Sequence, residues 1–317
     1  MNIFIELPTW LGDTVMTTPA IENIVQKYPD AKITTFGSFV SIEALKNHPN
    51  VIHSIIDNSK KSNFRFVRLY KIAKSLGTFD FAFSFRKTLS SKIFLFFLSA
   101  EKKFSYQRYT KDQLHQVIRY NDFINRALNR NLKPSNLKLY YKPKQFLKPT
   151  LGINPGATYG SAKRWYPERF AKVAKELSSS FDIIIFGGPS EVDMAEDIEK
   201  LLKDEGVKNF SNLAGKTSIK ELIENIAGLS LFITGDSGPM HVAASFNIPT
   251  ISLFGPTRYR ETSQWNNPFS TIVRHQIECS PCMKRECPLK TDECMKLITE
   301  DEVIKEAKKC YNASQKA

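Results

Sequence analysis

The chain has 317 residues, of which 42% are hydrophobic, and this is enough for two domains with cores of ordinary size. Its longest apolar burst, Ile93–Leu98, is far shorter than the ~20 residues of a membrane-spanning helix. Met1 leads directly into a predicted strand rather than into a signal peptide, so we expect a cytoplasmic protein.

The excess positive charge lies in one half of the chain. Residues 1–149 contain 24 Lys and Arg against 10 Asp and Glu, a net charge of +14, whereas residues 150–317 contain 21 against 22, a net charge of −1. A generally basic protein would carry the excess in both halves. The asymmetry therefore indicates an anionic partner for the first half: nucleic acid, an anionic membrane surface or a phosphorylated substrate.

Short apolar strands alternate with amphipathic helices through the first half, which is the signature of a parallel α/β sheet. Phe94, Phe96 and Phe97 are expected in its core. The predicted strands cover residues 2–6, 32–36, 51–56 and 79–85, and the predicted helices cover 14–28, 39–47, 64–76, 90–99 and 113–129.

Residues 131–149 carry three prolines and several lysines without a helical period, which is typical of a linker. The alternation then restarts, so the sequence predicts two α/β halves with a cleft between them: 1–149, including the linker, and 150–317. Whether the last helix packs back on the first half is left open. The second half has predicted strands at 151–154, 183–186, 229–233 and 250–254, and helices at 167–179, 191–205 and 218–228.

The loop that follows the first strand, Pro8–Asp13, places a carboxylate at the start of a predicted helix. Gly12 allows a tight turn, and Asp13 can act as a general base if its surroundings adjust its pKa. Asp is also a preferred helix N-cap, and the residues alone favour the cap.

A second candidate loop runs from Asn154 to Trp165, which is long for a connection between a strand and a helix. Its small residues allow a ligand to approach the backbone, and Thr158, Ser161 and Lys163 supply donors for phosphate oxygens. The glycine and lysine spacing is not that of a P-loop. The alternative is a solvated surface loop.

The third candidate is the stretch TGDSGPMHVAASFNIPTISLFGP, residues 234–256, which reads as strand, glycine turn, short helix and strand. Ligands bind at the carboxyl end of such a strand, and a helix start suits a phosphate. Asp236 cannot favour a phosphate, so we assign it to the hydroxyls of a sugar; alternatively, Asp236 or Ser237 only caps the helix. The loops at 186–189 and 212–217, the latter with Leu213, form either a nucleoside pocket or ordinary turns.

Four cysteines, Cys279, Cys282, Cys287 and Cys294, have the spacing C-x2-C-x4-C-x6-C, and Cys310 lies apart from them. In a cytoplasmic protein such closely spaced cysteines favour zinc over disulfides. Pro281 and Pro288 can instead shape a tight loop of reduced thiols. We assign no metal here and leave zinc binding open.

Five motifs, in this order, together resemble those of the bacterial ADP-heptose:lipopolysaccharide heptosyltransferases, glycosyltransferase family 9: PTWLGDTVMTTPA, NPGATYGSAKRWYPERF, NLAGKTS, TGDSGPMHVAA and CSPCMKRECPLKTDECMKLIT. Within the family they are most similar to the heptosyltransferase II subtype, which adds the second inner-core heptose. Subtypes I and III are the alternatives.

The resemblance implies a GT-B fold, with two Rossmann-like domains facing a central cleft. Residues 1–149 would bind the acceptor and residues 150–317 the ADP-heptose donor, and the anomeric centre would be inverted without a covalent enzyme intermediate. It assigns Asp13 as the base that deprotonates the acceptor hydroxyl, against the cap favoured above. The remaining implied substrate contacts are Lys163 and Thr158 with the diphosphate, Asp236 with the heptose, Gly238 and His241 with the phosphates, and also Gly12, Ser161, Leu213 and Ser237.

The departing ADP gains negative charge, which Lys163 and the helix start can stabilise. No acidic pair of the DxD kind is present near a glycine loop, so we expect no required cofactor and no metal. Two rival classes remain. A nucleic-acid-binding protein lacks a recognisable motif, so no nucleic-acid partner is expected, and a noncatalytic nucleotide-sugar-binding module would have no need of Asp13.

The implied acceptor is a phosphorylated, Kdo-bearing lipid A that carries one heptose and lies in an anionic inner leaflet. Basic residues of the first half would draw the enzyme to the cytoplasmic face of the inner membrane without any spanning segment. The candidates are Lys60, Lys61, Arg65, Arg68, Arg86, Lys87, Lys102 and Lys103.

Overall fold

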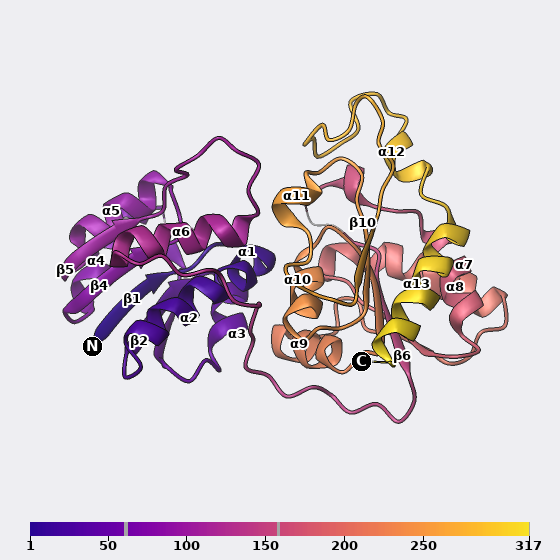
Figure 1. The fold of residues 1–317 in the computed structure, drawn as a ribbon, viewed down its shortest axis with the longest axis horizontal. Helices are drawn as coiled ribbons and strands as arrows, with labels where there is room; N and C mark the ends of the chain where they lie inside the picture. Colours follow the sequence, from indigo (N-terminus) through magenta and orange to yellow (C-terminus); the bar gives the residue numbers. More distant parts are fainter. Residues whose placement is uncertain (60–62, 157–158, 317) are drawn as a thin grey trace. The chain divides into compact units, whose positions relative to one another are not determined.

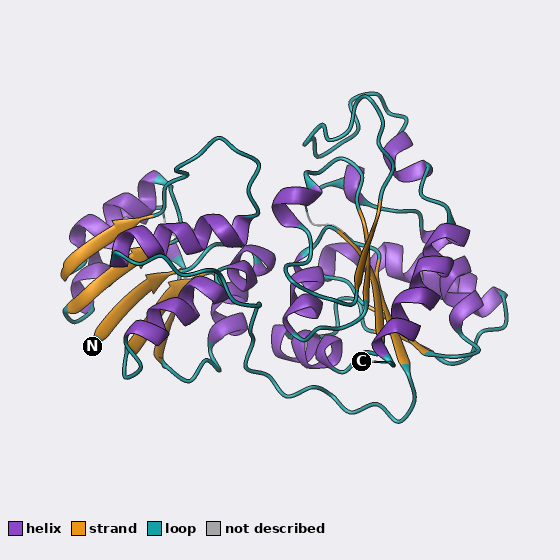
Figure 2. Ribbon diagram, in the orientation of Figure 1, coloured by secondary structure: helices purple, strands orange, loops and turns teal. Residues whose placement is uncertain are grey.

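The structure is a computed structural model that describes residues 1–59, 63–156 and 159–316 (Figures 1 and 2). The chain forms two compact units, Met1–Tyr140 and Tyr141–Ala317. Each unit contains one parallel sheet with helices on both of its faces (Figure 2). This confirms the predicted fold class of two Rossmann-like domains.

The sheet of the first unit has the strand order β3-β2-β1-β4-β5, and all of its pairs are parallel. The order reverses between β1 and β4, so the loops after these two strands lie together at the switch point. The elements are β1 (Asn2–Glu6), α1 (Leu11–Met16), α2 (Thr18–Lys27), β2 (Lys32–Gly37), α3 (Phe39–Leu45), β3 (Val51–Ile56), α4 (Arg65–Ser75), β4 (Phe79–Ser84), α5 (Leu89–Phe97), β5 (Ala100–Ser105) and α6 (Gln116–Leu128).

Aromatic side chains fill the core of the first unit. Phe4 of β1 contacts Phe36, Phe79 and Phe94, and Phe36 stacks on Phe94 with ring centroids 4.5 Å apart. Helices α4 and α5 pack side by side, as do α2 and α6. The prediction that Phe96 belongs to this core is wrong: its side chain is 76% exposed. Ser91 and Phe94 lie three positions apart on the buried face of α5, and Phe96 lies on the other face.

Three other expectations for the first unit need correction. The single helix predicted at 14–28 is two helices, α1 and α2, which meet at Thr17 just before Pro19. Gly12 is the second residue of α1 rather than part of a tight turn. Strand β5 escaped prediction because residues 101–103, Glu-Lys-Lys, interrupt the apolar alternation on an exposed edge strand.

The sheet of the second unit has the order β11-β10-β9-β6-β7-β8, again with parallel pairs, and its switch point lies between β6 and β9. The last helix, α13, packs on α7 and on the β9–β11 side of the sheet. The elements are β6 (Thr150–Asn154), η2 (Ser161–Lys163), α7 (Pro167–Leu177), β7 (Asp182–Ile185), η3 (Pro189–Glu191), α8 (Val192–Asp204), β8 (Phe210–Asn212), α9 (Ile219–Ala227), β9 (Leu231–Gly235), α10 (Gly238–Ser245), β10 (Thr250–Leu253), α11 (Tyr259–Thr262), β11 (Ser270–Val273), α12 (Glu293–Lys296) and α13 (Glu300–Ser314).

The stretch predicted as a linker, 131–149, has no regular secondary structure and contains the boundary between the two units. It is nevertheless held to each unit. The backbone N–H of Lys138 donates to Thr18 Oγ1 in the first unit, at 3.0 Å, and that of Lys144 donates to Glu224 O in the second, at 2.9 Å.

Candidate active site

The loops after β6 and β9 meet at the switch point of the second sheet, the place where open parallel sheets bind ligands. Asn154, the last residue of β6, joins them. Its Nδ2 lies 3.4 Å from both Thr234 Oγ1 and Ser237 Oγ, and these two hydroxyls are 3.0 Å apart. Two of the three loops singled out in the sequence are therefore parts of one site.

Lys163 and Asp236 form an ion pair in this site, although they lie 73 positions apart in the chain. Lys163 Nζ donates to Asp236 Oδ2 at 2.7 Å and to the Asp236 backbone O at 3.0 Å. The Lys163 and Asp236 side chains are 11% and 9% exposed, and the ring of Tyr159 lies 4.7 Å from the ammonium. The site therefore contains a cation whose orientation is fixed by the side chain and the backbone of Asp236.

Helix α10 begins immediately after this pair. Its N-cap residue is Ser237, whose side chain makes no capping hydrogen bond, and its first two residues are Gly238 and Pro239. His241 is buried within the helix. The alternative in which Asp236 or Ser237 serves only as a cap is not supported, because the carboxylate binds Lys163 and the Ser237 hydroxyl bonds Thr234.

The other residues predicted to contact the donor differ in their exposure and in the loops that carry them. Ser161 is exposed at the start of the short helix η2, and Leu213 is half-buried just after β8. The 212–217 loop lies beside the 186–189 loop, since the N–H of Gly215 donates to Gly187 O at 2.9 Å. Thr158 lies outside the described residues.

The sequence interpretation did not single out Glu191, which is 6% exposed beside the same loops. Its carboxylate accepts the Gly188 N–H at 2.7 Å. A Cβ on Gly156 would lie 2.1 Å from its carboxyl carbon, so only glycine fits there. The signal for Glu191 is weak in the sequence, because a single Glu after Gly-Gly-Pro-Ser reads as an ordinary helix start.

In the first unit, Asp13 lies in the first turn of α1 and Trp10 is the N-cap, so Asp13 is not the capping residue. Burial and the charge of Asp13 together raise the pKa of Tyr120 well above its usual range. Burial is also the main cause of the raised pKa of Tyr106, with Asp13 contributing. The ring centroids of Tyr106 and Tyr120 are 5.1 Å apart, and both hydroxyls feel the charge of Asp13. The half-buried Asp13 carboxylate therefore lies near these two tyrosines.

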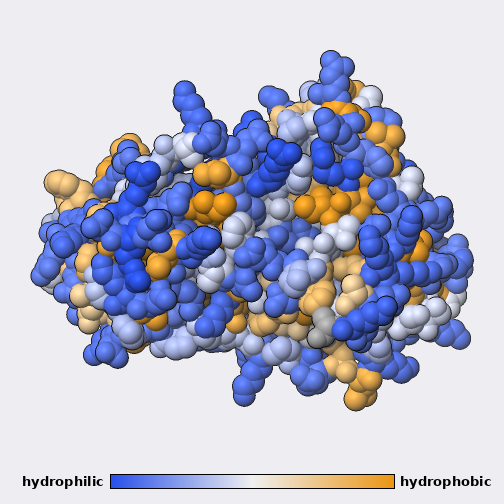
Figure 3. Space-filling model, in the orientation of Figure 1, coloured by the Kyte–Doolittle hydropathy of each residue, from blue (hydrophilic) through white to orange (hydrophobic). Residues whose placement is uncertain are grey.

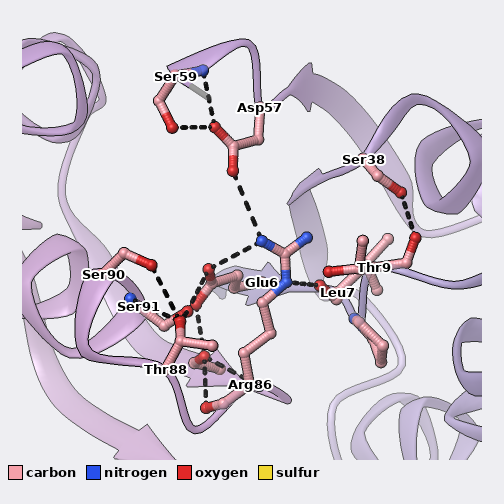
Figure 4. Close-up of polar contacts among 12 residues, drawn as sticks. Glu6, Leu7, Thr9, Ser38, Asp57, Ser59, Arg86, Thr88, Ser90 and Ser91 are labelled. Atoms are coloured by element: carbon pink, nitrogen blue, oxygen red, sulfur yellow. Dashed lines mark hydrogen bonds and ion pairs between the residues drawn. The ribbon is translucent and has the colours of Figure 1, made fainter. Parts of the chain in front are cut away.

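Side chains from several elements hold the loop between β1 and α1 (Figure 4). Arg86 Nε donates to Leu7 O at 2.6 Å, Ser38 Oγ donates to Thr9 O at 2.7 Å, and Ser41 Oγ donates to Pro8 O. These contacts fix the carbonyls that precede α1, and thereby the position from which Asp13 projects.

Arg86 also lies between two carboxylates (Figure 4). Its Nη1 is 3.5 Å from Glu6 Oε1 and 3.6 Å from Asp57 Oδ2, and its side chain is only 10% exposed. Burial raises the pKa of the Glu6 carboxyl, and the Arg86 charge opposes this rise. Arg86 is therefore committed to this network, which corrects its earlier placement among the surface cations.

Four cysteines, Cys279, Cys282, Cys287 and Cys294, line one cavity of about 20 Å³ in the second unit, and all five cysteines of the chain are free thiols. Burial and the three neighbouring thiols raise the pKa of Cys294 to about 11. Backbone N–H groups, that of Asp292 first among them, lower the pKa of Cys287. Within the described residues, no three or more His, Cys, Asp or Glu side chains are arranged to hold a metal ion.

The family model for glycosyltransferase family 9 (heptosyltransferase) matches residues 69–292. The chain is also 43% identical to lipooligosaccharide heptosyltransferase 2 of Campylobacter jejuni, over 97% of this chain and 98% of that protein. The chain belongs to glycosyltransferase family 9. Lipopolysaccharide heptosyltransferase 2 of Escherichia coli is a more distant relative of this glycosyltransferase, at 25% identity over 81% of the chain and 83% of that protein.

Solved structures confirm the GT-B fold of this glycosyltransferase. The structure of E. coli ADP-heptose LPS heptosyltransferase II matches with a TM-score of 0.81 at 22% identity, over 99% of this chain and 100% of that one. The structure of E. coli heptosyltransferase WaaC with ADP matches with a TM-score of 0.79 at 16% identity, over 98% and 100%. In the described part of the glycosyltransferase, no helix is long and apolar enough to cross a membrane.

Proposed function

We propose that this glycosyltransferase is a heptosyltransferase II, which transfers heptose from ADP-L-glycero-β-D-manno-heptose to the first heptose of the lipopolysaccharide inner core. The Campylobacter relative of that name matches almost the whole chain. The observation that carries the proposal is the Lys163–Asp236 pair at the switch point of the second sheet, because it places a cation that can bind phosphate beside a carboxylate that can bind sugar hydroxyls.

The donor is assigned to the second unit. Lys163 and the first turn of α10 would bind the diphosphate, and Asp236 would accept hydrogen bonds from heptose hydroxyls. Because Asp236 already orients the ammonium, Lys163 is in place to stabilise the charge that grows on the departing ADP. The further proposed contacts are Thr158, Ser161, Leu213, Ser237, Gly238 and His241.

The acceptor is assigned to the first unit, with Asp13 as the base. The Asp13 carboxylate takes the proton of the acceptor hydroxyl, and the hydroxyl oxygen bonds to the anomeric carbon. The bond between that carbon and the β-phosphate oxygen breaks, and ADP leaves with the electron pair, which inverts the anomeric centre. The cationic groups of the donor site supply the charge stabilisation, so this transfer step requires no metal cofactor.

We further propose that the first unit docks on an anionic membrane surface through α4 and α5. The two helices lie side by side and carry five basic residues and no acidic one. Phe66, Tyr70 and Phe96 are 50%, 43% and 76% exposed on them, and Tyr70 contacts Phe97 with ring centroids 4.9 Å apart. At the left of Figure 3, hydrophobic atoms lie among hydrophilic ones at the end of the first unit that carries these helices.

Basic side chains around exposed aromatic rings are typical of a surface that lies in the headgroup region without spanning the bilayer. Arg65, Arg68, Lys87, Lys102 and Lys103 remain candidate membrane contacts. Of these, Arg68, Lys87, Lys102 and Lys103 are exposed, whereas Arg65 is half-buried and binds Ser90 Oγ. Lys60 and Lys61 lie outside the described residues.

The test of the proposed reaction is the formation of both products, ADP and an acceptor one heptose heavier, by the purified protein supplied with ADP-heptose and a one-heptose lipid A. A noncatalytic nucleotide-sugar-binding module would bind ADP-heptose without forming either product. Binding of unrelated DNA at physiological salt, measured beside it, would favour the nucleic-acid alternative.

A further inference from the structure

The segment between β11 and α12 is ordered without a core of its own. None of the 19 residues 274–292 is buried, and the segment contains no helix or strand. Its backbone is nevertheless shaped in detail: Met283, Lys290 and Asp292 have φ values of 58°, 56° and 48°. Left-handed conformations of residues other than glycine cost free energy and persist only where the surroundings impose them. Hydrophobic burial, with Ile277 packed against the core, therefore supplies only part of its order. Hydrogen bonds supply another part, since the Met283 N–H donates to Pro256 O at 2.8 Å and Ser280 Oγ donates to Gly255 O at 2.6 Å.

The four cysteines of this region are further groups that can stabilise it. Cys279, Cys282, Cys287 and Cys294 line the same small cavity, together with apolar neighbours that include Pro256 and Leu289. Lys290 and Asp292, which lie between Cys287 and Cys294, both adopt left-handed conformations. They turn the chain around this cavity. The Asp292 N–H donates to Cys287 Sγ at 3.4 Å, which holds that sulfur beside the turn at Asp292.

We propose that Cys279, Cys282, Cys287 and Cys294 form a tetrathiolate site for one structural divalent metal ion of the kind that prefers tetrahedral sulfur ligands, zinc or ferrous iron. Four cysteines within 16 residues, spaced C-x2-C-x4-C-x6-C, supply the ligand number of a structural zinc site. On binding, each ligating thiol releases its proton to solvent. Since the thiols are not arranged at ligand distances in this structure, binding requires them to close on a common centre.

The site would also hold the donor loop, a consequence that rests on the function proposed above. The residues between Cys282 and Cys287 contact that loop directly. Tyr159 Oη donates to Met283 O at 2.9 Å, and the Ala162 N–H donates to Arg285 O at 3.1 Å. A Cβ on Gly160 would lie 2.2 Å from Arg285 O, so the two backbones are in close contact.

The contact extends to the proposed diphosphate-binding cation. The Tyr159 ring lies between two cations, with Lys163 Nζ at 4.7 Å and the Arg285 guanidinium at 5.4 Å from its centroid. A metal that fixes residues 283–286 thereby fixes the ring and loop on which Lys163 depends. The metal would position the loop that carries Tyr159 and Lys163 without contacting the transferred sugar.

The first measurement is the metal content of the full chain, purified under reducing conditions, by inductively coupled plasma mass spectrometry. We expect one equivalent of zinc or iron, and the analysis identifies which. The paired variant Cys282→Ser/Cys287→Ser should lose it. The matched control is Cys310→Ser, because Cys310 lies outside the cluster and its Sγ donates to Phe269 O, a bond that a serine hydroxyl can also make.

A second measurement does not depend on whether the paired variant folds. Cobalt(II) added to the reduced, metal-free chain should give the charge-transfer and d–d absorption of tetrahedral thiolate ligation at one equivalent. ADP affinity of the metal-free chain should fall at least fivefold and return on reloading. A chain that binds no zinc, iron or cobalt, a paired variant that keeps its metal, or a disulfide among the four cysteines in the reduced protein would overturn the proposal.

These readouts separate the metal site from the proposed function. Metal content and the cobalt spectrum report on the cysteines alone, whatever the substrate is. If the metal is present but its removal leaves ADP affinity unchanged, the tetrathiolate site stands and its coupling to the donor loop is wrong.

Discussion

Replacement of Lys163 by alanine tests the donor site. The Lys163 side chain pairs with Asp236, and we propose that it also stabilises the negative charge of the departing ADP. The change removes two hydrogen bonds, at 2.7 and 3.0 Å, and leaves the 9% exposed Asp236 carboxylate without its cation. Loss of one partner of a buried ion pair costs about 3–5 kcal/mol, and one charge-assisted hydrogen bond is worth about 1.5–3 kcal/mol. Because the pair keeps some contact with solvent, we expect Lys163→Ala to lower the free energy of unfolding by about 2–3 kcal/mol.

The kcat of Lys163→Ala should fall further than its loss of stability alone explains. Removal of one preorganised donor from a developing negative charge typically lowers kcat by about 10²- to 10³-fold. Urea unfolding gives the stability change, ADP titration gives ground-state binding, and the rate of ADP release at saturating donor gives kcat. We expect weaker ADP binding together with the loss of kcat, since Lys163 would contact the phosphates in both states.

Lys203→Ala is the matched control. Lys203 pairs with Glu199 in the same unit at 2.7 Å, but its side chain is 63% exposed, and exposed pairs contribute about 0–1 kcal/mol. It should leave stability and turnover close to those of the unaltered protein. Unchanged ADP affinity and turnover in Lys163→Ala would refute the assignment of the 154–165 loop to the diphosphate.

Three further predictions concern the first unit. Asp13→Asn should lose most of its turnover yet keep ADP affinity, by product formation and ADP titration; near-normal turnover would exclude Asp13 as the base. Burial raises the pKa of the Glu22 carboxyl, but hydrogen bonds, first that from His48, lower it overall below its usual value. The ionised Glu22 carboxylate therefore stabilises the fold above the pKa that it has in the unfolded chain, and this stabilisation is lost as pH falls. Urea unfolding between pH ~6 and ~3 should show a smaller loss of unfolding free energy for Glu22→Gln than for the unaltered protein, and equal losses would contradict this. Phe96→Asp should weaken sedimentation with anionic vesicles while the binding that remains still falls with salt, and equal binding to neutral vesicles would exclude the α4–α5 surface.

Local sequence patterns predicted most of the fold, because strands such as β1 and β3 and helices such as α7 are set by nearby apolar residues. They also placed the three loops that follow β1, β6 and β9. What they could not show were contacts between distant residues. Nothing around Lys163 reveals that its partner is Asp236, and nothing around Arg86 reveals that Glu6 and Asp57 enclose it.

Side-chain exposure was the other weak point. The run Ile93–Leu98 was interpreted as a single apolar burst, but the helical period of α5 buries Phe94 and turns Phe96 outward. This error concealed the aromatic part of the surface now assigned to the membrane. Glu191 was missed for a related reason, since its burial depends on the approach of Gly156 from another loop.

We propose above that this glycosyltransferase adds the second inner-core heptose. The most direct test is turnover of ADP-heptose with three lipid A acceptors, bearing zero, one or two heptoses, at equal concentrations in the same vesicles. We predict that the one-heptose acceptor is extended and that the other two are not. Extension of the acceptor without heptose, or of the one with two, would contradict the claim and assign the chain to the subtype I or III reaction instead.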